Sequence, residues 1–254
     1  MYYYIYDIFT NQKKYERNLQ KIESKLADLG IQGRVCKLNV LKNLNNILEE
    51  IEANNIKNII AVGNDQTVSK ISSLLIDKNL VLGYIPIEPN SVIASIFGID
   101  NYESACEIIS KRKIAKIDVG KINGQYFLFS VESPTNEIAL KFDKYKISPR
   151  QNNQSAGIYN INIDKQEFTS NPSDGKMEAV FSPRLKSSWF SWFKPKSKPT
   201  NNKSVFPITK VDIKHNRKPV MLIIDRARKI KTPVEIEVLK QKLKIIVGRD
   251  RMFE

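Results

Sequence analysis

The residues best placed to do chemistry form one short stretch, Gly63-Asn64-Asp65-Gln66-Thr67. Four apolar residues at 59–62 precede it, which is typical of a strand buried on both faces. Asn, Asp and Thr begin helices, and apolar residues at helical spacing follow. A buried strand that turns into a helix N-terminus presents free N–H groups to phosphate. The alternative is an ordinary strand-to-helix turn, because one glycine is weak support for a phosphate site.

Carboxylates later in the chain could complete such a site. Phosphoryl transfer needs groups that neutralise the phosphates and a carboxylate that takes the hydroxyl proton. Asp225 follows the apolar run 221–224 and therefore ends a core strand. At that position it could be a catalytic base or a turn residue. Asp174 precedes a glycine, so it could lie in a β-turn or bind a metal. The pair Asn90-Ser91 could donate hydrogen bonds to phosphate.

Strand and helix patterns alternate over the first 111 residues. Apolar and β-branched runs predict strands at 2–9, 34–38, 57–62 and 81–87, and apolar periodicity predicts helices between them. Helices are expected at 13–29 and around 44–51, then from the end of the strand 57–62 to about residue 75, and finally near 93–97 and at 102–111. This alternation predicts a doubly wound parallel sheet with helices on both faces, in an α/β nucleotide-binding domain of residues 1–115.

The pattern changes after Lys113. Asn123-Gly124 joins two apolar runs, which is a strong hairpin signal. Short β-rich runs follow, and they predict an antiparallel β-sandwich as a second domain of residues 116–254. These strands are expected at 137–142, 157–163, 176–181, 205–213, 220–224, 234–238 and 243–247.

Composition limits the classes of protein. The chain has 254 residues and a net charge of +14, and residues 182–251 carry all of it, with 19 Lys and Arg against 5 Asp and Glu. The second domain therefore offers a basic surface. Cys36 and Cys106 are expected to be reduced core thiols of a cytoplasmic protein. No run of about 18 apolar residues predicts a membrane-spanning helix. A single His excludes a zinc site built from several histidines.

One aromatic and basic segment stands out in the second domain. Four aromatic residues precede a series of spaced lysines, which fits peripheral contact with an anionic membrane at its inner face. These residues are Trp189, Phe190, Trp192, Phe193 and Lys194. The alternative is a hairpin whose aromatic side chains cover the sandwich. Nucleic acid is a weaker candidate partner, because no known binding motif accompanies the charge.

In their order, these features resemble the diacylglycerol kinase catalytic domain, within the superfamily of diacylglycerol, sphingosine and NAD kinases. Gly63–Thr67 takes the place of the family's Gly-Gly-Asp-Gly-Thr motif, and residues 82–87 resemble the strand before its second phosphate loop. Residues 118–127 resemble the crossover hairpin, and residues 173–178 resemble the Asp-Gly-x-Leu-Asp turn. Asp225 falls where the family has Asp-Gly-Glu.

The resemblance implies an ATP- and Mg²⁺-dependent kinase that phosphorylates a lipid hydroxyl, with the nucleotide in the cleft between the domains. Nucleotide-binding residues would be Gly63, Asn64, Asp65, Thr67, Asn90 and Ser91, with Asp225 as the base and Asp174 at a structural metal.

The sequence departs from the family at the phosphate loops. Residues 88–92, Glu-Pro-Asn-Ser-Val, replace Gly-Thr-Gly-Asn-Asp, so the glycines that let N–H groups approach phosphate are missing. Arg226 and Ala227 replace the Gly and Glu beside Asp225. Two functions therefore stay open. One is an active lipid kinase, and the other is an inactive relative that binds a nucleotide, a lipid or an acidic partner.

Overall fold

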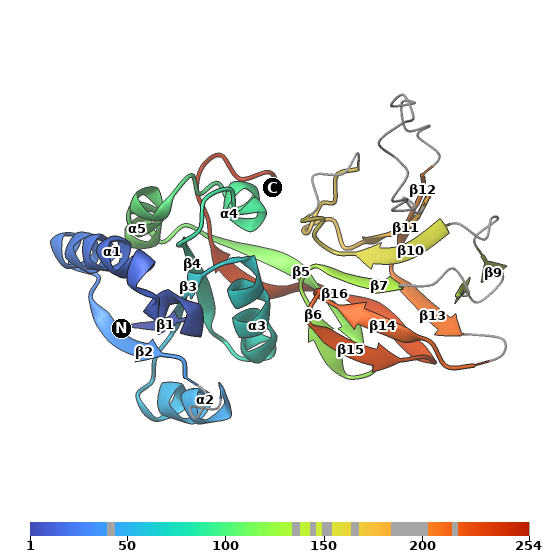
Figure 1. The fold of residues 1–254 in the computed structure, drawn as a ribbon, viewed down its shortest axis with the longest axis horizontal. Coiled ribbons are helices and arrows are strands. Elements are labelled where there is room, and N and C mark those ends of the chain that lie inside the picture. Colours follow the sequence, from blue (N-terminus) through green and yellow to red (C-terminus); the bar gives the residue numbers. More distant parts are fainter. Residues whose placement is uncertain are drawn as a thin grey trace.

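The computed structural model describes residues 1–39, 44–133, 138–142, 146–148, 154–163, 168–183, 203–214 and 218–253. The predicted membrane-contact residues Trp189, Phe190, Trp192, Phe193 and Lys194 lie outside these ranges, so that contact stays a prediction. Figure 1 shows two lobes, with helices around a sheet in the first and mostly strands in the second.

A parallel sheet forms the first lobe, in the strand order β2-β1-β3-β4. Its strands are β1 (Tyr2–Tyr6), β2 (Gly33–Lys37), β3 (Asn58–Gly63) and β4 (Val81–Pro86). Its helices are α1 (Glu16–Asp28), α2 (Leu44–Ala53), α3 (Asp65–Leu75), α4 (Val92–Ile96) and α5 (Tyr102–Lys111), with short 3-10 helices at Ile8–Asn11 and Lys13–Tyr15.

Helices cover both faces of this sheet. The hydroxyl of Tyr4 donates to the carbonyl of Ile31, just after α1, whereas the neighbouring Tyr3 donates to Glu50 on α2. Adjacent strand residues point to opposite faces, so α1 and α2 lie on opposite sides. The predicted doubly wound arrangement is therefore confirmed.

Strands β5 (Ile114–Ile122) and β16 (Val234–Ile246) run from the first lobe into the second (Figure 1). They pair antiparallel, and the end of β16 also pairs in parallel with β4. The predicted domain boundary at 115/116 falls inside β5, and the division into two domains stays a prediction.

Two sheets form the predicted β-sandwich of the second lobe. One continues from β16 through β13, β8 and β9, and the other has the order β12-β11-β10-β7-β14-β15. A second apolar core, including Ile158, Ile213 and Leu222, lies between them. The strands are β6 (Gln125–Phe127), β7 (Ser130–Ser133), β8 (Ala139–Lys141), β9 (Lys146–Ile147), β10 (Gln154–Tyr159), β11 (Met177–Pro183), β12 (Ser204–Ile208), β13 (Lys210–Lys214), β14 (Met221–Ile224) and β15 (Arg228–Lys231).

Three strand predictions were wrong in detail. Residues 234–246 form one long strand with an irregularity between Leu239 and Leu243, where two strands were expected. Residues 205–213 form two strands, β12 and β13, in different sheets. Strand β15 was missed because Arg228–Lys231 has only one apolar residue.

Two further sequence predictions, the hairpin turn and the buried free cysteines, fit the structure. Asn123 and Gly124 have positive φ angles of 44° and 81° in the turn between β5 and β6, as the hairpin signal requires. Cys36 and Cys106 are both buried and free. Among the described helices, none is both long enough and apolar enough to cross a bilayer.

Candidate functional site

The first bend, Gly63–Thr67, connects β3 to α3. The Asn64 side chain accepts a 3.2 Å hydrogen bond from the Thr67 N–H, and the Thr67 hydroxyl accepts from the Asn64 N–H at 3.1 Å, which forms a capping box. A Cβ at Gly63 would lie 2.3 Å from Thr67 Oγ1, so packing against Thr67 requires this glycine. Thr67 Oγ1 also donates to Asp7 Oδ2 at 2.7 Å. The bend is therefore bound to itself and to the end of β1.

Asp65 is bound to the second bend, Glu88–Ser91, which follows β4. Its carboxylate accepts hydrogen bonds from the Ser91 hydroxyl and, at 3.2 Å, from the Val92 N–H at the start of α4. The Tyr84 hydroxyl lies 3.4 Å from the same carboxylate and 3.2 Å from Ser91 Oγ. Burial and the charge of Asp65 raise the pKa of Tyr84, so this phenol stays a donor. These contacts hold the two bends together.

Glu88 adds a second link between the bends. Its carboxylate accepts from the Tyr15 hydroxyl at 2.9 Å and from Asn64 Nδ2 at 3.4 Å. Asn90 is exposed and has a positive φ of 63°. The predicted nucleotide-binding residues are thus brought together, and most of their polar groups bind one another.

A cavity of about 370 Å³ lies beside the second bend, between α1, α4 and the start of α5. Amide, hydroxyl and phenol groups line it, with two carboxylates. Among the described residues that line it, none is Lys or Arg. Its polar lining residues are Asn18, Glu88, Asn90, Ser91, Asp100, Asn101 and Tyr102.

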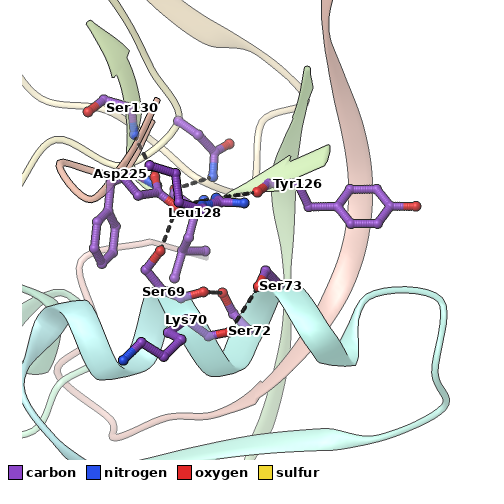
Figure 2. Close-up of polar contacts among 11 residues, drawn as sticks. Ser69, Lys70, Ser72, Ser73, Tyr126, Leu128, Ser130 and Asp225 are labelled. Carbon is purple, nitrogen blue, oxygen red and sulfur yellow. Dashed lines mark hydrogen bonds and ion pairs between the residues drawn. The ribbon is translucent and has the colours of Figure 1, made fainter. Parts of the chain in front are cut away.

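Asp225, the predicted base, lies in the turn between β14 and β15 and is 1% exposed. Figure 2 shows its carboxylate directed toward α3, where Ser69 Oγ donates to Oδ2 at 2.5 Å. The backbone N–H of Leu128 donates to Oδ2 at 3.0 Å. The N–H groups of Phe129 and Ser130 donate to Oδ1 at 2.7 and 3.1 Å. The Nη2 atom of Arg228 lies 3.4 Å from Oδ2 of Asp225 and completes the set of donors.

The turn that carries Asp225 has an unusual backbone. Asp225 and Arg226 have positive φ angles of 47° and 59°, and the Ala227 N–H donates to the Ile224 carbonyl at 3.0 Å. This is the geometry of a tight turn between antiparallel strands, in which Gly or Asn is usual. Because the carboxylate binds three consecutive N–H groups in the loop between β6 and β7, it offsets the strain of the turn.

The predicted metal residue Asp174 lies in a turn of the second lobe, where its carboxylate accepts the Lys176 N–H at 2.9 Å. Nearby, Asp118 is buried and accepts the N–H groups of Gly175 and Gln241 at 2.6 and 2.7 Å. Burial raises the pKa of Asp118. Burial and the charge of Asp174 raise the pKa of Glu178 to about 8. Within the described residues, no three His, Cys, Asp or Glu side chains form a metal-binding group.

The residues present do not fit a nucleoside triphosphate with Mg²⁺. The oxygens of Asp65 and Asp225 accept hydrogen bonds from the protein itself. Glu88 brings negative charge to the bend where phosphates were expected, and Pro89 has no N–H to donate. The hydrogen bonds of these carboxylates are those of helix caps and turn anchors, and they take up the oxygens that phosphate-bound Mg²⁺ would need.

Sequence reasoning missed several partners of these groups. Ser69 and the N–H groups of Leu128–Ser130 carry no local signal, because only the folded chain brings them to Asp225. Asp7 could have been found, since a carboxylate directly after an apolar strand lies at the same sheet edge as the first bend.

Comparisons with known proteins agree with the resemblance to the diacylglycerol kinase catalytic domain. Residues 2–122 match the family model for the diacylglycerol kinase catalytic domain. The fold is similar to a diacylglycerol kinase from Bacillus anthracis str. Sterne, with a TM-score of 0.76, 18% identity, and coverage of 99% of this chain and 98% of that one. A second structure from that strain, provisionally assigned to the same kinase class, has a TM-score of 0.78 and 16% identity over 99% and 97% of the chains. No curated protein has a matching sequence.

The whole chain thus has the two-lobed fold of these solved structures, and its residues 2–122 match the diacylglycerol kinase catalytic domain. The resemblance to the diacylglycerol kinase catalytic domain is confirmed, with the family match over residues 2–122 and with divergent phosphate loops.

Proposed function

We propose that this chain is a non-transferring relative of the diacylglycerol kinases that binds a nucleoside-like ligand in the cavity beside Glu88–Ser91. The observation that carries the proposal is the hydrogen bonding of Asp225. Its two oxygens accept from Ser69 and from three backbone N–H groups, and the residue is 1% exposed. A general base must reach the proton that it removes, and a carboxylate held this way has no free oxygen to offer.

The first bend supports the same conclusion. Asp65 binds Ser91 and the Val92 N–H, where an active kinase would use such groups on phosphate or metal. Replacing these internal bonds would leave Ser91 and Tyr84 in need of new partners. The bends therefore favour a closed arrangement without bound phosphate.

The cavity of about 370 Å³ supports the choice of ligand. This volume is in the range of small-molecule sites. Asn18 and Asn90 can pair with the edge of a heterocyclic base, and the Tyr102 ring offers a stacking surface. Asn101 can offer only its NH₂ group, because its Oδ1 caps α5. The carboxylates of Glu88 and Asp100 can accept hydrogen bonds from ribose hydroxyls, and their negative charges repel phosphates.

Lipid phosphorylation with ATP and Mg²⁺ is the second candidate. It is favoured by the family match and by the position of Asp225, whose partner Ser69 lies one helical turn from Asp65 on α3. In that case the bends would have to separate before a nucleotide could enter.

Transfer of radiolabelled phosphate separates the two candidates. Purified protein is incubated with γ-labelled ATP, Mg²⁺ and mixed lipids, and a lipid kinase of known activity is the positive control. We expect no labelled lipid from this chain. Labelled lipid that disappears in the Asp225→Asn variant, with folding intact, would establish the kinase and refute the proposal.

A further inference from the structure

A second cavity, of about 490 Å³, lies where β5 begins, against the loop before β11 and the C-terminal tail. None of its lining residues belongs to the two bends or contacts Asp225. Three cationic side chains line it, with one carboxylate. The charged and polar lining residues are Lys113, Lys116, Asn171, Ser173, Asp174, Gln241 and Arg251.

The cations of this cavity form no ion pair with any residue that the structure describes. Neither an ion pair nor a side-chain hydrogen bond joins Lys113, Lys116 or Arg251 to another residue of the described part of the chain. The Nε atom of Arg251 is buried and lacks a hydrogen-bond partner among the described residues. A buried guanidinium nitrogen without a partner is costly. Because Nε itself is inaccessible, a ligand in the cavity would contact other atoms of the Arg251 side chain, which lines it.

The walls of the cavity are fixed. Buried Asp118 accepts the N–H groups of Gly175 and Gln241 at 2.6 and 2.7 Å, and its own N–H donates to the Pro172 carbonyl at 2.6 Å. These bonds hold the loop at 171–175 against the irregularity of β16.

The tail that carries Arg251 is anchored as well. The Gly248 N–H donates to the Phe97 carbonyl at 2.8 Å, and the Met252 N–H donates to the Ile96 carbonyl at 3.0 Å. Arg251 is therefore presented from a backbone that is bound on both sides, which lowers the entropy cost of ligand binding.

We infer that this cavity binds a phosphate group, as a phosphomonoester or as free phosphate. Three cations suit a dianion with several acceptor oxygens, and an Arg guanidinium matches phosphate geometry. Asp174 at the rim and Asp118 beneath the loop oppose the anion, and their two carboxylates are outnumbered by the three cations.

Calorimetric titration of the full chain tests this inference with three probes: inorganic phosphate, dihexanoyl phosphatidate below its micelle concentration, and uncharged dihexanoylglycerol. We expect the first two to bind at one site and the third not to bind there. Tighter binding of the phosphatidate would identify a lipid headgroup, and equal binding would identify free phosphate. Absence of binding of both phosphates at millimolar concentration would overturn the inference.

Matched variants locate the site. Arg251→Gln and Lys113→Gln are expected to weaken phosphate binding by at least about tenfold. Arg249→Gln, two residues away and exposed outside the cavity, is expected to leave it unchanged. Asp174→Asn keeps an oxygen that can accept the Lys176 N–H and removes the opposing charge, so binding should tighten severalfold. Equal loss in the Arg249 and Arg251 variants, or weaker binding in Asp174→Asn, would contradict the inference.

Discussion

Ser69 on α3 and Asp225 in the β14–β15 turn are 156 residues apart in sequence, yet their side chains are joined by a 2.5 Å hydrogen bond. The bond links a helix of the first lobe to a hairpin of the second (Figure 2). The same carboxylate also holds the loop between β6 and β7. Asp225 therefore acts as an anchor between the lobes, at the position where the family resemblance places a catalytic base.

Replacing this anchor should destabilise the protein. In Asp225→Asn one oxygen becomes an NH₂ group, which faces N–H donors and cannot accept from them. We expect a loss of about 3 kcal/mol in the free energy of unfolding, measured in urea. Asp250→Asn, at an exposed position, serves as the control. A fully stable Asp225→Asn variant would show that the carboxylate does not anchor the lobes.

The contribution of the bond between the lobes can be measured separately. Ser69→Ala removes one buried donor to Asp225 and should cost about 1–2 kcal/mol. Ser73→Ala, on the same helix, removes only a bond to the Lys70 carbonyl and should cost much less. Equal effects of the two variants on urea unfolding would count against a special role for Ser69.

Glu178 on β11 should make stability depend on pH. Burial and the charge of Asp174 raise the pKa of its carboxyl from 4.5 to about 8, and Oε2 is buried without a partner among the described residues. The folded state therefore keeps a proton that the unfolded chain loses above pH 4.5. The stability linked to Glu178 is fully present below that pH and is lost as pH rises to about 8.

Glu178→Gln tests the assignment. The amide cannot ionise, so its free energy of unfolding should fall less than that of the natural protein between pH 5 and 8, the window set by the two pKa values. If the free energy of unfolding changed equally with pH in the two proteins, the assignment to Glu178 would be refuted.

The basic aromatic segment at 189–198 gives a prediction for membrane binding. Each lysine near an anionic surface contributes about 1 kcal/mol. Replacing Lys194, Lys196 and Lys198 by Gln should therefore weaken sedimentation with anionic vesicles by at least about tenfold. Replacing Lys13, Lys21 and Lys37 in the first lobe is the matched control. Equal binding of the natural protein to neutral and anionic vesicles would contradict the prediction.

The first lobe was well predicted because local patterns define it. The apolar run at 59–62 forms a strand buried on both faces, and Asn64 caps the helix that follows. The second lobe was harder, since its strands are defined by pairing. The long strand β16 was predicted as two because its irregularity at Gln241, with a φ of 52°, interrupts the alternation.

The sequence predicted that the residues of the two bends lie together, but it did not predict their hydrogen-bond partners. The residues of both bends lie together, as expected from strands that end at one sheet edge. Sequence alone could not show that Asp65 binds Ser91, or that Asp225 binds the loop between β6 and β7. Such bonds depend on distances that only the folded chain defines.

Calorimetric comparison of adenosine with ATP·Mg²⁺ tests the central claim most directly, because it needs no acceptor lipid. We expect adenosine to bind the cavity beside Glu88–Ser91, and ATP·Mg²⁺ to bind no more tightly. Tyr102→Ala should weaken adenosine binding by about tenfold, and Tyr102→Phe, which keeps the ring, should restore it. Binding of ATP·Mg²⁺ at least tenfold tighter than adenosine, and lost in Asp65→Asn, would contradict the account.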